Sequence, residues 1–136
     1  MKIIEGKIFP GQGIGEFMLG SDEDAVLANI EGEYKRIERE NGISLVIIEN
    51  AKFWFDSNKH LFQIGVTVGF LSKYDNIIGI GDTLTDVQEK VGPFYEENDD
   101  YLVQGIKGIA FELGDTNNLE WDEMRAPIEW MYVYKV

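Results

Sequence analysis

The sequence contains no cysteine, a single histidine, and only 12 lysine and arginine residues against 25 aspartates and glutamates. Without cysteine the chain has no disulfide, no thiolate nucleophile and no cysteine zinc site. With His60 alone, a histidine-rich metal site and a paired-histidine proton shuttle are excluded as well. We therefore expect a protein that carries no metal or other cofactor.

Long apolar runs are also missing. No stretch approaches the roughly 20 apolar residues of a membrane-spanning helix, and residues 2–5 are too short and too soon charged for a secretory signal. We therefore expect a cytoplasmic protein with no membrane partner.

The residues of common active sites are scarce. All four serines, Ser21, Ser44, Ser57 and Ser72, stand in capping or turn contexts, and none has a nucleophile-elbow pattern. The glycines of 11–15 lack the spacing of a dinucleotide fingerprint, and Glu16 would repel phosphate. A carboxylate pair such as Glu112 with Glu129 could do acid-base chemistry, but carboxylates are too frequent here for any pairing to be informative. We expect a protein that is not an enzyme.

What the chain does contain is enough apolar material for one compact domain. It has 136 residues, of which 44% are hydrophobic, and its aromatic residues are three Trp, six Tyr and eight Phe. Such a composition favours a folded globule over disorder. We expect a single domain over residues 1–136.

A weak internal repeat runs through this domain. Four pairs of residues share one offset of 61 positions: Gly20 with Gly81, Val26 with Val87, Ile30 with Val91, and Tyr34 with Tyr95. After each copy comes a polar, strand-like stretch and then an aromatic strand, at 53–55 and at 109–111. We predict two tandem units, over about 10–70 and about 77–136, and expect them to explain the scaffold rather than an active site.

Each unit is predicted to open with a short helix. Ser21 is the expected N-cap of the first, whose apolar stripe is Val26, Leu27 and Ile30. Asp82 or Thr83 is the expected cap of the second, which Gly92 and Pro93 terminate.

Strand patterns follow each helix. They cover 34–40, 43–49, 52–56 and 61–70 in the first unit, and 94–97, 101–106, 108–113 and 128–136 in the second; a further strand is expected at 2–9. These patterns predict an α+β domain, in which two helix-plus-antiparallel-meander units form one sheet with the helices on one face. The other face is then partly exposed. The aromatics that could lie there are Phe53, Phe55, Trp130, Tyr132 and Tyr134. At least half of them are expected in the core instead. For the two tryptophans Trp54 and Trp130, the core is the expected location.

Charge and length distinguish the second unit from the first. Residues 1–68 hold 11 acids and 7 bases (−4), whereas residues 69–136 hold 14 acids and 5 bases (−9). Residues 114–127 also insert a polar segment that the first unit lacks. Its oxygen ligands, from 115 to 123, could attract a divalent ion, but the sixth and twelfth loop positions do not fit an EF-hand. We expect a solvated loop.

Excess negative charge of this kind repels nucleic acid and anionic membranes and steers a cationic partner inward. The alternative is that the acidity serves solubility alone. Trp121 lies within the acidic insertion and is either an interface residue or part of a small loop core with Leu119.

The repeated segment resembles a known repeat. Each copy begins with a capped stretch, Gly20-Ser21 or Gly81-Asp82-Thr83, and carries Val26 or Val87. Each then closes on glycine and precedes an aromatic meander. The segment is similar to the repeat shared by the beta-lactamase inhibitor protein and the SmpA/OmlA lipoproteins. The resemblance implies a non-enzymatic binder: one relative clamps an enzyme with a concave sheet, and the other is an outer-membrane assembly factor. This chain lacks the lipobox cysteine and the disulfides. It therefore fits neither a lipoprotein nor a secreted inhibitor, and no site residue is carried over.

Our leading hypothesis is an acidic protein-binding module, of the immunity or inhibitor kind, that covers a cationic partner such as a nuclease toxin. The candidate partner-binding residues are acids and aromatics of the second unit: Glu96, Glu97, Asp99, Asp100, Tyr101, Asp115, Glu120, Trp121, Asp122 and Glu123. Two alternatives stay open: a self-associating structural or regulatory domain of unknown oligomeric state, and a small-ligand-binding domain with a cleft between the units.

Overall fold

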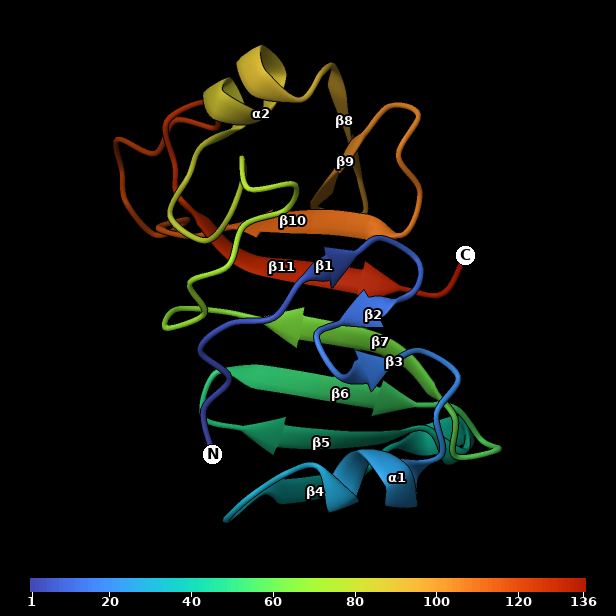
Figure 1. The fold of residues 1–136 in the computed structure, drawn as a ribbon. Helices are drawn as coiled ribbons and strands as arrows, with labels where there is room; N and C mark the ends of the chain where they lie inside the picture. Colours follow the sequence, from blue (N-terminus) through green and yellow to red (C-terminus); the bar gives the residue numbers. More distant parts are fainter.

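An eight-stranded antiparallel sheet forms the body of the computed structural model, which describes all residues from 1 to 136 (Figure 1). Its strand order is β4-β5-β6-β7-β11-β10-β9-β8. The strands are β4 (Lys35–Glu38), β5 (Ser44–Ile48), β6 (Ala51–Phe55), β7 (Leu61–Val66), β8 (Phe94–Glu97), β9 (Asp100–Val103), β10 (Ile109–Leu113) and β11 (Ile128–Tyr134). All eight fall within or next to the predicted ranges. An α+β chain built on an antiparallel sheet is confirmed, with strands dominating.

Two short helices precede the two groups of four strands. Helix α1 (Glu23–Ala28) comes before β4 to β7, and α2 (Leu84–Lys90) comes before β8 to β11. The two groups meet at the centre of the sheet, where β7 and β11 pair antiparallel. None of the helices has the length and apolar character needed to cross a membrane.

The predicted cap is confirmed for α2 and wrong for α1. Thr83 forms a capping box, in which its hydroxyl accepts from the Asp86 amide at 3.2 Å and the Asp86 carboxylate accepts from the Thr83 amide at 3.0 Å. In the first helix Asp22 is the N-cap, with no side-chain bond, and Ser21 lies outside. The Ser21 carbonyl instead accepts from the Leu61 amide at 2.9 Å, which holds Ser21 beside the start of β7.

The N-terminal segment differs from its prediction. Residues 2–9 do not form one strand; instead β1 (Ile8–Phe9), β2 (Gly13–Ile14) and β3 (Phe17–Met18) form a small three-stranded sheet. The start of the chain is held by a buried side chain, because Asn50 accepts from the Ile3 amide at 2.9 Å and donates to the Ile3 carbonyl at 2.7 Å. A side-chain amide thus replaces a strand partner for Ile3.

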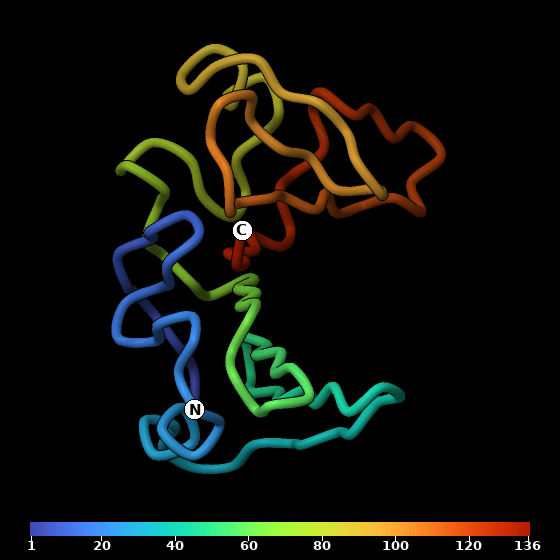
Figure 2. The backbone as a smooth tube through the Cα atoms, turned by 90° about the vertical axis from the view of Figure 1, so that its right-hand side faces the viewer, coloured from blue at the N-terminus to red at the C-terminus, as the bar shows by residue number.

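One face of the large sheet carries the core. Cross-strand pairing aligns Val46, Phe53, Ile64, Val133 and Ile109 in one row on this face. They belong to a single cluster of buried residues that includes apolar side chains of both helices and of the small sheet. Both helices and the small sheet therefore pack on the same side (Figure 2).

The opposite face, which we call the open face, is covered by neither helices nor the small sheet. Its residues alternate with those of the core along each strand. They include Ile47, Lys52, Trp54, Gln63, Gly65, Trp130, Tyr132, Tyr134, Ala110, Glu112, Asp100, Leu102 and Glu97. The β4–β5 and β8–β9 turns both project to this side (Figure 2). The backbone at both ends of the sheet therefore extends toward the open face (Figure 2).

The aromatics divide between the two faces. Phe53 and Phe55 are fully buried in the core, whereas Trp130, Tyr132 and Tyr134 are half-buried on the open face. Trp54 is also half-buried there, so the expectation that Trp54 and Trp130 lie in the core is wrong. Alternation is the reason, since Trp54 follows the buried Phe53 and must point to the other side.

Candidate functional site

Three aromatic rings from two strands lie together on the open face. Tyr132 is in the middle, with its ring centroid 5.9 Å from Trp54 in an edge-on arrangement and 6.0 Å from Trp130 in a parallel one. The Lys52 ammonium lies 4.7 Å from the centroid of the Trp130 ring. These contacts make a row of half-exposed aromatic surface across the centre of the sheet.

Small residues on the neighbouring strands make room for the central ring. Tyr132 pairs with Gly65 on β7 and with Ala110 on β10. A Cβ at Gly65 would lie 2.8 Å from the Tyr132 ring and 3.3 Å from the Trp130 ring. Glycine is thus required here because the rings lie against the backbone.

Carboxylates surround the hydroxyl end of Tyr132. The hydroxyl donates to Glu112 Oε1 at 2.7 Å. Burial raises the pKa of Tyr132, and so do this hydrogen bond and the charges of Glu112, Asp100 and Glu129. The tyrosine therefore stays a neutral donor, and the negative charge stays on the acids.

A cavity of about 230 Å³ opens beside this tyrosine. Its lining comes from five strands and one turn: Gln63, Glu97, Asn98, Asp100, Leu102, Ala110, Tyr132 and Tyr134. Desolvation raises the pKa of Asp100 to about 6, and the neighbouring charges of Glu112 and Asp99 act in the same direction. The cavity thus has aromatic walls and an acid that the protein itself destabilises in its charged form.

Two of the sequence-predicted site residues lie at this cavity. Glu97 and Asp100 pair across β8 and β9 and line it together, while Asp99 occupies the turn between them. Glu96 alternates to the other face of β8, where it pairs with Tyr101. The predicted acidic surface is therefore divided between both sides of the sheet.

Tyr101, which the sequence suggested as an anchor for a partner, is only 4% exposed and belongs to the core. Its hydroxyl donates to Glu123 Oε2 at 2.8 Å. Burial raises the pKa of Tyr101, followed by this hydrogen bond and the charges of Glu123 and Glu96. Tyr101 therefore ties the insertion to β9, and its ring is not available to a partner.

The insertion itself, residues 114–127, forms a loop of turns without helix or strand. Trp121 is 37% exposed and donates from Nε1 to the Gly114 carbonyl at 3.1 Å, whereas Leu119 is fully exposed. A small core shared by Trp121 and Leu119 is therefore not formed. Trp121 is held in place at the loop surface.

The other predicted acids of the loop, Asp115, Glu120 and Asp122, do not join the open-face cavity. Asp122 accepts from the Met124 amide and from Arg125, and both bonds lower its pKa. No group of three or more acidic or histidine side chains is arranged to hold a metal ion.

Sequence reasoning left out part of the open face. Trp54 of the aromatic row was not among the candidate site residues, nor were Lys52 and Gly65, which lie next to the row. The signal was present in the alternation of residues 51–55 and 128–134, which assigns Trp54 and Tyr132 to the face opposite Phe53 and Val133. What the alternation cannot give is the pairing of β7 with β11, which brings these residues together.

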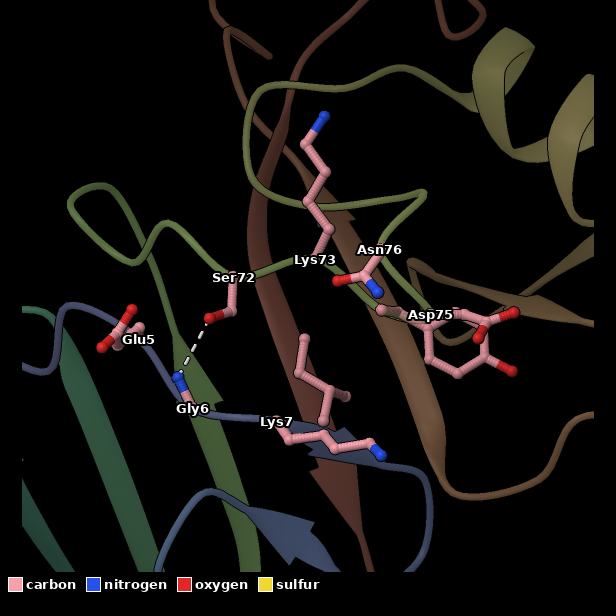
Figure 3. Close-up of a pocket in the computed structure, with 9 residues that line it drawn as sticks. Glu5, Gly6, Lys7, Ser72, Lys73, Asp75 and Asn76 are labelled. Atoms are coloured by element: carbon pink, nitrogen blue, oxygen red, sulfur yellow. Dashed lines mark hydrogen bonds between the residues drawn. The ribbon is translucent and has the colours of Figure 1, made fainter.

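A larger cavity, of about 710 Å³, lies on the core side between residues 5–8 and residues 72–76 (Figure 3). Its central contact is the hydrogen bond from the Gly6 amide to the Ser72 hydroxyl at 3.0 Å. Lys73 extends away from this contact and its ammonium lies 3.2 Å from Asp82. These polar groups hold the N-terminal segment to the loop, so we assign the cavity a structural role.

Comparison with known proteins bears on the fold alone. No protein-family model matches the chain, and a search of curated proteins gave no significant match. A similar solved structure is the crystal structure of the uncharacterized protein yfeY from Escherichia coli. It is 11% identical, with a TM-score of 0.60 over 99% of this chain and 100% of that chain. At this identity, the similarity identifies a shared fold and carries no function.

Proposed function

We propose that this chain is a non-enzymatic protein-binding module that covers a cationic partner with the open face of its sheet. The observation that carries the proposal is the row of Trp54, Tyr132 and Trp130 beside the carboxylates of Glu97, Asp100 and Glu112. Tryptophan and tyrosine are enriched where binding energy concentrates, and acids beside them select for positive charge.

The charge distribution supports the same partner class. The second half carries a net charge of −9, of which Asp115, Glu120 and Asp122 on the loop are a part. Such a field accelerates the approach of a cationic protein and repels nucleic acid. An inhibitor of a nuclease toxin is one partner relationship of this kind, and the proposed setting is the cytoplasm.

The test is affinity capture from the native cell, followed by measurement of association with the captured protein. We expect a partner with a basic surface, and an association rate that falls about tenfold between about 0.05 and about 0.5 M salt. A captured partner whose association rate is insensitive to salt would contradict the electrostatic part of the proposal.

Variants locate the contact. Trp130→Ala should weaken binding about 30-fold, the cost of truncating a central interface aromatic. Leu71→Ala is the matched control, because Leu71 is 72% exposed and lies outside the open face. Trp121→Ala tests the insertion. If only the Trp121 variant loses binding, the partner binds the loop and the open face is the wrong surface.

We also propose that residues 10–70 and 77–136 are two copies of one structural unit. The support is that each has a helix followed by four antiparallel strands, and that the strand order runs in opposite directions from the central β7–β11 pair. On this view the partner site lies where the copies differ in side chains.

Self-association through a sheet edge is the second candidate, since β4 and β8 each leave one edge unpaired. Both edges carry charged side chains, Lys35 and Glu38 on β4 and Glu96 and Glu97 on β8. Charged edge strands disfavour extension of a sheet into a second copy. We therefore rank this candidate second.

A further inference from the structure

We propose that the cavity between Tyr132, Tyr134 and Asp100 is a subsite for one arginine or lysine side chain of the partner. This inference rests on the proposed function, because it names the part of a cationic protein that the open face recognises. It is argued from the lining, the charge and the size of the cavity.

The cavity combines the two kinds of group that recognise an organic cation. Tyr132 and Tyr134 supply aromatic rings, whose faces attract an ammonium or guanidinium group. Glu97 and Asp100 supply carboxylates in the same cavity, and Glu112 lies next to it through its bond with the Tyr132 hydroxyl. A guanidinium group can stack on a tyrosine ring and bind a carboxylate at the same time.

The negative charge of the cavity has no internal counterion. The ion pairs of the protein involve Arg36, His60, Lys73, Lys90 and Arg125, and none of them reaches Glu97, Asp100 or Glu112. On the open face, Lys52 lies over Trp130 instead, and Lys35 is on β4, at the edge of the sheet opposite β8. Asp100 is partly desolvated beside other acids, a position that an incoming cation would relieve.

Size favours a side chain over a free metabolite. The cavity measures about 230 Å³, whereas sites for small-molecule ligands occupy roughly 300–1,000 Å³. It also opens on a broad aromatic surface, which would contact the chain that carries the inserted side chain. A metal ion is a poorer occupant, because no three acidic side chains converge and tyrosine rings are not its ligands.

The test uses small probes and the whole protein. N-acetyl-arginine N-methylamide, its lysine counterpart and the neutral citrulline counterpart are titrated at about pH 7.5, followed by amide NMR. We expect the cationic probes to shift signals of residues 97–102, 110 and 132–134, with a dissociation constant on the order of 1 mM. The citrulline probe should shift none of them, and the arginine and lysine titrations show which head group is preferred.

Two variants of equal charge change sharpen the test. Asp100→Asn should weaken binding of the preferred cationic probe about tenfold, whereas Asp24→Asn, at an exposed position in the first turn of α1, should leave it unchanged. The Asp100 carboxyl signal provides a second readout, since bound cation should lower its pKa from about 6. The acids that face it from the adjoining strands and turn, Glu97, Asp99 and Glu112, are followed in the same spectra.

The inference is overturned if citrulline binds as well as arginine and lysine, if Asp100→Asn has no effect, or if the shifts map to residues 114–127. Its failure is distinguishable from that of the proposed function. Should the probes not bind while Asp100→Asn captures the same basic partner as the wild type, the subsite is wrong and the open-face function stands. Should the probes bind while no cationic protein is captured, the protein partner is wrong.

Discussion

At the scale of the residue, the buried Glu23 and the half-buried Asp100 have opposite effects on stability. Glu23, on α1, is 5% exposed and accepts hydrogen bonds from Arg36 and Ser44. These bonds, led by that from Arg36, lower its pKa, against the effect of burial. Asp100 has no such donor, and burial beside other acids raises its pKa to about 6. The first charge stabilises the fold, and the second is tolerated in spite of its cost.

Replacing Asp100 should therefore stabilise the protein above neutrality. A carboxyl group with a raised pKa in the folded state favours folding at low pH, and this contribution is lost as the pH rises from about 4 through about 6. At about pH 8 the free energy of unfolding of Asp100→Asn should exceed that of the wild type by about 1 kcal/mol, after allowance for solvent screening. At about pH 4 the two free energies should be equal. Urea unfolding at both pH values checks this. A destabilised variant at pH 8 would contradict it.

The opposite pH dependence is expected for Glu23. Its pKa is lowered in the folded state, so its contribution is present above the unfolded pKa and is lost as the pH falls through the folded one. Glu23→Gln should cost about 2–3 kcal/mol at neutral pH, and less in acid. Glu38→Gln is the control, since Glu38 also meets Arg36 but its side chain is 76% exposed. Equal losses in the two variants would show that burial of Glu23 is unimportant.

At the scale of the element, the sequence predicted all eight long strands and both helices, because alternation and capping signals are local. It failed where a distant contact decides the local structure. Ser21 looks like a cap, but its carbonyl accepts from the Leu61 amide. Residues 2–9 look like a strand, but only Ile8 and Phe9 form one, and the Asn50 side chain bonds the backbone of Ile3. The candidate site was half predicted for the same reason: Glu97 and Asp100 are neighbours across a short turn, whereas Tyr132 meets them only through the order of the sheet.

The two helix starts make a matched pair of substitutions. Thr83→Ala removes the hydroxyl that accepts from the Asp86 amide, leaves the bond from the residue 83 amide to the Asp86 carboxylate, and should cost about 1 kcal/mol. Ser21→Ala should cost much less, because the Ser21 side chain forms no cap. Thermal or urea unfolding of both variants measures the difference. Equal costs would mean that Ser21 acts as the cap in solution.

Strand β7 requires a residue without a side chain at position 65. Gly65→Val should displace the Tyr132 and Trp130 rings, because even a Cβ would lie 2.8 Å from the tyrosine ring. We expect a loss of about 1–3 kcal/mol in stability and a change in the near-ultraviolet circular dichroism of these rings. An unchanged near-ultraviolet spectrum of Gly65→Val would contradict the close approach of these rings to the β7 backbone.

At the scale of the whole molecule, both unpaired edges of the sheet carry charged side chains. With a net charge of −13, we expect a monomer of 15.5 kDa over a wide range of concentration. Sedimentation velocity tests this. Neutralising the β8 edge with Glu96→Gln and Glu97→Gln should promote association if charge is what protects that edge. A sedimentation coefficient of the wild type that rises with concentration would instead favour the self-association candidate.

The ring geometry described for Tyr132 also gives the protein an optical reporter. Two of its three tryptophans, Trp54 and Trp130, flank that tyrosine on the open face, and the third is Trp121 on the loop. Replacing Trp121 with phenylalanine would remove the background and leave emission that comes from the proposed docking surface alone. Binding to that surface could then be followed in real time by tryptophan fluorescence without a dye, even before the binding partner is identified.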